Sequence, residues 1–219
     1  MNLATAILLS YILGAVPFSF ILGKLIKNID LRKVGSGNIG ATNLARVAGY
    51  KVGVVALILD ILKGIIPVAY FSDLVTINYG LSKDTIMLLL GIISICGHNW
   101  TIFLKFRGGK GIATSLGVLI GLGIKNFLIL KVLLLLATMW FTTLVLSGFV
   151  SLASILAAIF LPLFLIIFKL SSSFVIFGIV IAIFAIYRHK SNIVRLLQHK
   201  ENRFNIKSKF FKSTKKPLP

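Results

Sequence analysis

Gly-Ser-Gly-Asn-Ile-Gly-Ala-Thr-Asn-Leu-Ala-Arg, residues 35–46, is a polar, glycine-rich stretch that lies between two long apolar runs. Its closely spaced glycines allow tight turns and bring backbone N–H groups near a ligand. The serine, asparagine, threonine and arginine side chains add hydrogen-bond donors around those turns. The stretch therefore predicts a cradle for an anion, held between two apolar helices.

The composition around this stretch is that of a membrane protein. The 219 residues are 58% hydrophobic, have a mean hydropathy of +1.00 and include only five acidic side chains. These values exclude an ordinary soluble domain. The net charge of +19 does not indicate a nucleic-acid-binding protein, because no soluble scaffold is present to carry the basic residues. It fits instead the basic cytoplasmic loops of a membrane protein, with the lipid bilayer as a partner.

Seven apolar segments predict membrane-spanning helices, each of which needs roughly 20 residues. Pro17 is expected to kink the first, and the fourth and seventh are short. The chain therefore predicts an all-α, polytopic membrane helix bundle of about seven transmembrane helices, a single domain over residues 1–219 with a basic tail from about residue 188. The predicted spans cover residues 3–23, 52–71, 85–104, 112–124, 127–146, 149–168 and 173–187.

The distribution of basic residues predicts the orientation. If all seven segments cross, the loop around residues 35–46, a second glycine-rich segment at residues 105–111 and the C-terminal tail lie on one side, with most of the 24 Lys and Arg residues. The positive-inside rule then places the N-terminus outside and the C-terminus in the cytoplasm. Without a crossing at residues 112–124 the basic tail would lie outside, so the charges favour seven spans over six.

The second glycine-rich segment, Lys-Phe-Arg-Gly-Gly-Lys-Gly at residues 105–111, has the character of the first with more charge. Neither segment is a nucleotide motif. Gly35, Gly37 and Gly40 match Gly-x-Gly-x-x-Gly, but a basic loop precedes them where the dinucleotide fingerprint needs a strand. Residues 108–111 lack the glycine spacing of a Walker A loop and the Ser or Thr after its lysine. Both are predicted to face the cytoplasm, and the open alternative is that their charges only set the topology.

A third polar cluster follows the last predicted span, where residues 188–192 read Arg-His-Lys-Ser-Asn. Most of the basic residues beyond it suit an amphipathic helix on an anionic membrane face. His189 and Asn192 lie at the membrane depth of the two glycine-rich segments and are predicted to complete one site with them. For Glu201, a structural ion pair is preferred over a catalytic role.

Ionisable residues also occur inside the predicted spans. Asp60 and Lys63 are three residues apart and are expected to pair on one helix face. His98 lies near the end of the third span and is interpreted as an interfacial anchor.

Taken together, these segments resemble the three signatures of the bacterial acyl-phosphate:glycerol-3-phosphate acyltransferases, the PlsY-type integral membrane enzymes. The similarity rests on residues 35–43, on residues 103–114 and on residues 188–196, in that order, and it extends to Asp60-x-x-Lys63-Gly64. The resemblance implies transfer of a fatty acyl group from acyl phosphate to the 1-hydroxyl of sn-glycerol 3-phosphate, which gives lysophosphatidic acid for phospholipid synthesis. It also implies an acyl-CoA-independent enzyme in the inner (plasma) membrane.

The resemblance and the residue chemistry together suggest a site. Ser36, Arg46, Lys110, His189 and Asn192 are the expected catalytic residues. Cationic side chains suit the two phosphates, and short polar ones suit the glycerol hydroxyls or the acyl carbonyl. The expected substrate-binding residues are Gly37, Asn38, Thr42, Asn43, Arg107, Gly108, Gly109 and Gly111.

The chain departs from the family pattern in two places. Arg107 stands where lysine is common, and His199 and Lys200 replace glycine and a small residue, which leaves the role of Glu201 open. No metal is expected, since no acidic cluster accompanies the motifs, and no cofactor is expected.

Acyl phosphate is already activated, so direct attack by the bound hydroxyl is the predicted mechanism. His189 or a substrate phosphate would accept the proton. The alternative function is a transporter for phosphorylated solutes, although such proteins tend to show repeats and midplane sites.

Overall fold

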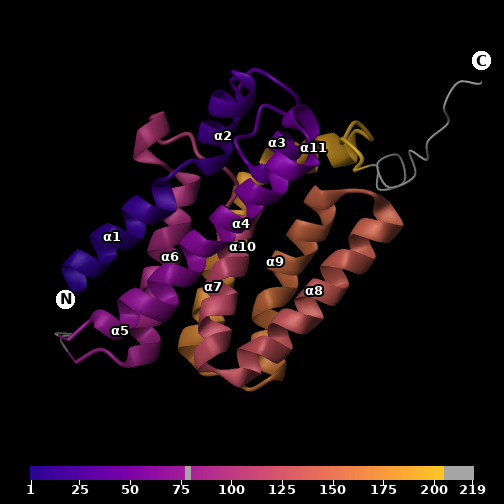
Figure 1. The fold of residues 1–219 in the computed structure, drawn as a ribbon. Coiled ribbons are helices and arrows are strands. Elements are labelled where there is room, and N and C mark those ends of the chain that lie inside the picture. The colour runs from indigo at the N-terminus through magenta and orange to yellow at the C-terminus, as the bar shows by residue number, and fades with distance from the viewer. Residues whose placement is uncertain (77–79, 205–219) are drawn as a thin grey trace, which may run out of the picture.

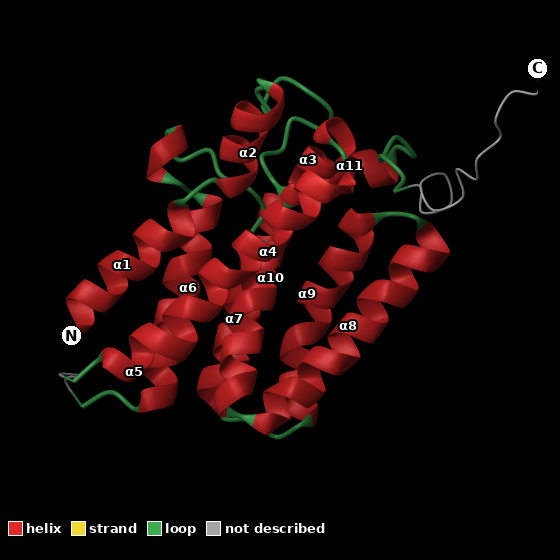
Figure 2. Ribbon diagram, in the orientation of Figure 1, coloured by secondary structure: helices red, strands yellow, loops and turns green. Residues whose placement is uncertain are grey.

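The protein is all-helical in the computed structural model, which describes residues 1–76 and 80–204 (Figure 1). No strand occurs within those ranges, and Figure 2 shows helices joined by loops, with long ones at the upper end beside the helices Phe18–Lys27 and Ala41–Ala48. A turn of π-helix, Pro67–Phe71, follows the α-helix Tyr50–Ile66, and a turn of 3₁₀-helix, Ile102–Leu104, follows the α-helix Lys83–Asn99. The α-helices are α1 (Leu3–Ala15), α2 (Phe18–Lys27), α3 (Ala41–Ala48), α4 (Tyr50–Ile66), α5 (Ser72–Leu74), α6 (Lys83–Asn99), α7 (Ile112–Lys125), α8 (Phe127–Ser147), α9 (Val150–Ile167), α10 (Ser172–Arg188) and α11 (Lys190–Leu197).

Helices form at all seven predicted spans. Over residues 1–76 and 80–204, five helical segments are long and apolar enough to cross a membrane: Leu3–Lys27, Tyr50–Leu74, Lys83–Leu104, Phe127–Ser147 and Val150–Ile167. The pair α10 and α11 makes a sixth, bent by 61°. Helix α7 is apolar but has only 14 residues, as its short sequence predicts. The fold is therefore a membrane helix bundle with five or six helices of spanning length.

Glycines allow α4 and α7 to pack closely. A Cβ on Gly64 would overlap the carbonyl oxygen of Thr114, and a Cβ on Gly117 would overlap that of Ile61. Because lipid tails are as apolar as leucine, close backbone contact of this kind is a main source of helix association in a bilayer. Large apolar side chains fill the remaining interior between α6 and α10 in one core cluster, including Val118, Leu122, Ile129, Leu161, Phe174 and Phe177.

At the predicted kink, Val16 and Pro17 separate α1 from α2, which together still make one segment of spanning length. Proline has no N–H to donate, so the helical hydrogen bonding is interrupted here. The freed carbonyl of Val16 accepts a hydrogen bond from Lys63 Nζ at 3.0 Å. The break directs α2 to the upper end of the bundle in Figure 1, where α2, α3 and α11 lie together.

Asp60 and Lys63 form the predicted pair inside the bundle. Their side chains are 2% and 1% exposed, and Lys63 Nζ lies 2.8 Å from Asp60 Oδ1. The interpretation of His98 as an interfacial anchor is wrong. Its side chain is 8% exposed and Nδ1 lies 3.8 Å from Asp60 Oδ1, because the α6 helix face that carries it points into the protein.

Replacing Lys63 with methionine is expected to destabilise the protein by about 3–5 kcal/mol, because Asp60 would remain buried without its partner. The double variant Asp60→Asn with Lys63→Met is expected to lose less, since no unpaired charge remains. Unfolding in mixed detergent measures the free energy of unfolding of the single and the double variant. The exposed Asp30–Arg32 pair, at 2.7 Å, is the control, and Arg32→Met is expected to change unfolding far less. Equal effects at the two pairs would contradict the expectation.

Candidate active site

The first glycine-rich loop is held in shape by the side chain of Asn43 at the start of α3. Asn43 Oδ1 accepts a hydrogen bond from the Ser36 backbone N–H at 2.9 Å. Asn43 Nδ2 donates to the carbonyls of Leu31, Val34 and Asn38 at 3.2, 3.0 and 2.9 Å. The loop turns back toward α3 through Gly35 and Gly37, which have φ angles of 61° and 71°. Asn43 therefore organises the loop from inside the protein.

The second glycine-rich loop is held between α6 and α10. Its backbone N–H groups at Gly108 and Gly109 donate to the carbonyls of Asn99 and His98 at 3.2 and 3.1 Å. On the other side, the Arg188 guanidinium donates through Nη2 to the Gly108 carbonyl at 2.6 Å and through Nε to the Gly109 carbonyl at 2.9 Å. The two peptides are thus fixed from both sides.

The third segment connects to the second through a chain of hydrogen bonds. Lys110 Nζ donates to Asn192 Oδ1, and Asn192 Nδ2 donates to Glu201 Oε1 at 2.8 Å. Glu201 Oε2 accepts from Arg195 Nε, also at 2.8 Å, so the predicted ion pair of Glu201 is confirmed. These contacts fix the Lys110 side chain against the start of α11.

His189 lies at the junction of α10 and α11 with a side chain that is 2% exposed. Its Nδ1 lies 2.8 Å from the carbonyl oxygen of Ala185. A carbonyl can only accept, so in the neutral ring Nδ1 carries the proton and Nε2 holds the free lone pair.

The three segments surround a cavity of about 290 Å³. Among the described residues, four cationic side chains and no carboxylate line it. Such a cavity suits a phosphate group. Its lining consists of Ser36, Gly37, Asn38, Gly108, Lys110, Tyr187, Arg188, Lys190, Ser191 and Arg195.

The environment of Lys110 alters its acidity. The pKa of Lys110 is lowered to about 8, chiefly by burial; the negative charge of Glu201 raises it, and the positive charges of Arg195, Arg188 and Arg46 lower it. The Lys110 ammonium is therefore close to titration at physiological pH, and a bound anion would stabilise its charged form.

Five of the predicted site residues line the cavity: Ser36, Gly37, Asn38, Gly108 and Lys110. Behind the lining lie Asn43, Gly109, Gly111, His189 and Asn192, all of them buried. Thr42, Arg46 and Arg107 are exposed and are not lining residues, although the charge of Arg46 contributes to lowering the pKa of Lys110.

Sequence reasoning assigned no role to Tyr187, Arg188, Lys190, Ser191 or Arg195, all of which line the cavity. Their sequence signal was their position beside His189 and Asn192. Across the described residues 1–76 and 80–204, no three His, Cys, Asp or Glu side chains form a group that could hold a metal ion. The lining offers cationic and neutral donors instead, which suit an anionic ligand.

Comparison with known proteins identifies the family. The model of the glycerol-3-phosphate acyltransferase family matches residues 4–199. The chain belongs to this family. It is 42% identical over 198 residues to the glycerol-3-phosphate acyltransferase of Fusobacterium nucleatum, a match that covers 90% of this chain and 96% of the relative. The enzyme of the same description from Desulforamulus reducens is 40% identical, with 88% and 90% coverage.

Solved structures of the family share the fold. The chain superposes with a TM-score of 0.83 on the crystal structure of PlsY, an integral membrane glycerol 3-phosphate acyltransferase, in its glycerol 3-phosphate form. The two are 37% identical over 95% of this chain and 98% of that one. The lysophosphatidic acid form of PlsY gives a TM-score of 0.79 at 35% identity. The predicted membership of a PlsY-type family and the predicted acyltransferase activity toward glycerol 3-phosphate are confirmed.

Proposed function

We propose that the chain transfers a fatty acyl group from acyl phosphate to the 1-hydroxyl of glycerol 3-phosphate in the cavity between the two glycine-rich loops and α11. The observation that carries the proposal is the cavity lining, with four cationic side chains and two loops whose peptides are fixed. Both substrates carry phosphate, and the acyl chain gains about 0.8 kcal/mol per methylene buried in the apolar phase. A cationic cavity at the end of a membrane bundle suits this pair.

Lys110 and Arg195 are assigned to binding the substrate phosphate, because both charged groups line the cavity. Asn192 holds the Lys110 ammonium, and Glu201 holds both Asn192 and the Arg195 guanidinium. Ser36 and Asn38, which line the cavity from the first glycine-rich loop, are assigned to the glycerol hydroxyls or the acyl carbonyl. Arg46 and Arg107, outside the lining, are assigned to attracting the anionic substrates. Thr42, also outside the lining, is proposed to contact the incoming substrates beside Arg46.

The proposed reaction is a direct transfer. The 1-hydroxyl oxygen attacks the acyl carbonyl carbon, the bond from that carbon to the phosphate oxygen breaks, and inorganic phosphate leaves. Among residues 1–76 and 80–204, no histidine or carboxylate is hydrogen-bonded to Ser36 Oγ, which argues against a serine nucleophile. His189 is buried behind the lining, and this favours a substrate phosphate as proton acceptor, with His189 supporting the wall.

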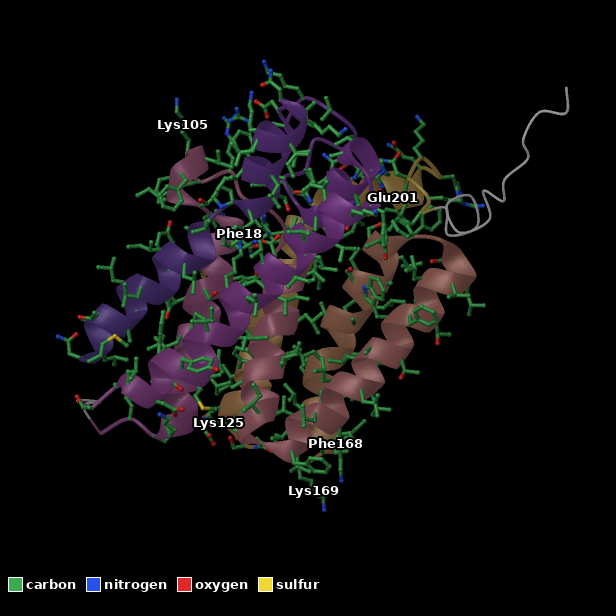
Figure 3. The ribbon with its side chains drawn as sticks, in the orientation of Figure 1. Phe18, Lys105, Lys125, Phe168, Lys169 and Glu201 are labelled. Atoms are coloured by element: carbon green, nitrogen blue, oxygen red, sulfur yellow. The ribbon has the colours of Figure 1, made fainter. Side chains whose placement is uncertain are left out.

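The proposed topology has seven crossings, with the N-terminus outside and the site facing the cytoplasm at the inner (plasma) membrane. The charge distribution supports it. Figure 3 shows Lys105 and Glu201 at the upper end of the bundle, with Lys125 and Lys169 at the lower end. Most basic residues belong to the loops of the upper end and to the C-terminal region, as positive-inside orientation requires.

An acylation assay on the purified protein tests the proposed function. With palmitoyl phosphate and glycerol 3-phosphate, we expect lysophosphatidic acid and inorganic phosphate in equal amounts, and no product with palmitoyl-CoA. The same protein in proteoliposomes tests the rival transporter function. Uptake of glycerol 3-phosphate without acylation would contradict the proposal, and trapping of an acyl group on Ser36 in a quenched reaction would contradict direct transfer.

The pKa of Lys110 predicts a pH dependence. As pH rises through about 8, the free enzyme loses the Lys110 ammonium and the KM for glycerol 3-phosphate is expected to rise. Below that pH the side chain is charged and the KM should level off. Bound phosphate favours the charged form, so the fall in kcat is expected at a higher pH than the fall in kcat/KM.

Lys110→Arg provides the matched control, because arginine stays charged across this range. Its KM is expected to be nearly constant from pH 7 to pH 9.5, whatever its absolute activity. A pH profile shared by the wild type and Lys110→Arg would assign the transition to another group.

A further inference from the structure

A buried polar cluster lies directly under the second glycine-rich loop and is not part of the cavity lining. It consists of Asp60 and Lys63 on α4 and His98 on the last turn of α6, with side chains 1–8% exposed. Lys63 also bonds to the Val16 carbonyl at the break between α1 and α2. The cluster therefore joins four structural elements, the α1–α2 break, α4, α6 and the loop, at one point.

The His98 ring contacts the loop through Gly109. A Cβ on Gly109 would overlap His98 Nε2 and would lie 3.0 and 3.1 Å from the ring carbons Cε1 and Cδ2. The His98 carbonyl accepts the Gly109 N–H at 3.1 Å, so backbone and ring meet the same residue. Gly109 consequently has no room to move toward α6.

The opposite edge of the ring faces the ion pair. His98 Nδ1 lies 3.8 Å from Asp60 Oδ1, which is beyond hydrogen-bond length, so the carboxylate supports the ring by packing against it. A buried ion pair resists displacement strongly, since moving one partner leaves the other unpaired. The His98 ring is therefore packed between the Asp60–Lys63 ion pair and Gly109.

Gly109 lies between Gly108 and Lys110, which both line the cavity. Arg188 draws the Gly108 and Gly109 carbonyls toward α10, and His98 blocks their movement toward α6. The position of the loop between α6 and α10 therefore depends on both contacts. The same contacts decide where Lys110 Nζ lies in the cavity.

We propose that His98 is a positioning residue for acyl transfer, whose buried ring, supported by the Asp60–Lys63 pair, sets the depth of the glycine-rich loop at residues 108–110. The proposal rests on the proposed function for its kinetic consequence, but the coupling of His98 to Gly109 is a property of the structure. The ring acts through Gly109 and touches no substrate.

A double-mutant cycle tests the contact. Gly109→Ala inserts a methyl group into the ring and is expected to lower kcat/KM for glycerol 3-phosphate about 100-fold, the size of effect expected from displacing a binding loop by about 1 Å. His98→Ala removes the support and is expected to raise KM with a smaller effect on kcat. The double variant gives the new methyl group space, so it is expected to recover about tenfold of the loss caused by Gly109→Ala alone.

The cycle needs a control at a crowded glycine that does not touch His98. A Cβ on Gly91, also on α6, would lie 2.6 Å from Val118 Cγ1. Gly91→Ala combined with His98→Ala is expected to show independent effects. Recovery in the Gly109 pair but not in the Gly91 pair supports the proposal, and independent effects in both pairs overturn it.

Two further variants decide the test if Gly109→Ala does not fold. Glutamine at position 98 keeps a polar atom near the place of Nε2, and asparagine keeps one near the place of Nδ1. We expect His98→Gln to retain most of the glycerol 3-phosphate affinity and His98→Asn to lose as much as His98→Ala. The reverse order would overturn the proposal, because the contact with Asp60 and not the contact with Gly109 would then matter.

Direct binding of glycerol 3-phosphate by calorimetry is measured beside the kinetics for every variant. If the wild type binds glycerol 3-phosphate but forms no lysophosphatidic acid, the proposed function fails while the binding data still decide the coupling. If the wild type is active and the cycle shows no coupling, only the positioning role fails.

Discussion

Gly108→Ala is expected to lower kcat/KM for glycerol 3-phosphate by about 100-fold or more, because a loop displacement of about 1 Å at a reacting centre has an effect of this size. A Cβ at this position would overlap the His98 carbonyl oxygen and would lie 2.6 Å from the backbone carbon and oxygen of Asn99. These are backbone atoms of α6, and no side-chain rotation relieves the clash. The Gly108 peptide must move away from α6, and it would lose its bond to Asn99 as it does so.

The measurement is steady-state kinetics with thermal unfolding of the same samples. Gly123→Ala is the matched control. Gly123 lies near the end of α7, far from the cavity, and its Cβ would overlap only Leu130 Cδ2, the end of a flexible side chain on α8. We expect Gly123→Ala to keep the wild-type KM. A Gly108→Ala enzyme that folds and keeps wild-type kcat/KM would show that the loop position does not matter for the reaction.

Lys110→Met is expected to lower kcat by about 10²- to 10³-fold, the effect typical of removing one charged or hydrogen-bonding group that stabilises the transition state. Lys110 lines the cavity and is held by Asn192. Methionine keeps most of the side-chain volume and removes only the ammonium. The change also leaves Asn192 Oδ1 without its donor, so part of the loss reflects a less ordered wall.

Exposed Lys105 belongs to the same loop and is not a lining residue, so Lys105→Met separates local charge from general attraction of the substrate. Its effect is expected to be small and to shrink with added salt. The loss in Lys110→Met should persist at high salt. Equal, salt-sensitive losses of activity in both variants would show that Lys110 acts only through general electrostatic attraction of the substrate.

The helices were predictable because each depends on local sequence. Runs of apolar residues, the proline at position 17 and the spacing of Asp60 and Lys63 led to the helical spans, the break and the ion pair. The number of crossings and their direction rest on charge and remain predictions, since apolar length alone supports five or six.

The site was predictable in its segments and less so in its individual residues. Arg46 and Asn43 illustrate the difference. Both are polar residues of one short helix, yet Asn43 is buried under the loop while Arg46 is exposed. Which face of α3 turns inward is decided by its packing against α4, and a sequence pattern of eight residues does not determine that.

Arg188 and His98 were missed for a related reason. Arg188 contacts the Gly108–Gly109 peptides from α10, which is distant in sequence, and His98 contacts them from the end of α6, just before the loop; both contacts exist only after α6 and α10 have packed against the loop. A basic residue at the end of an apolar helix is common at membrane interfaces, so Arg188 carried no special local signal.

Contact between Lys110 and the substrate phosphate is tested by a distance measurement between Lys110 Nζ and bound glycerol 3-phosphate. Protein containing ¹⁵N-labelled lysine is reconstituted in lipid, and solid-state NMR measures the coupling of lysine nitrogen to the phosphorus of the substrate, with Lys110→Arg used to assign the signal. We expect direct hydrogen-bond contact between Nζ and a phosphate oxygen, at about 2.7–2.9 Å. A bound substrate whose phosphorus shows no coupling to Lys110 would contradict it.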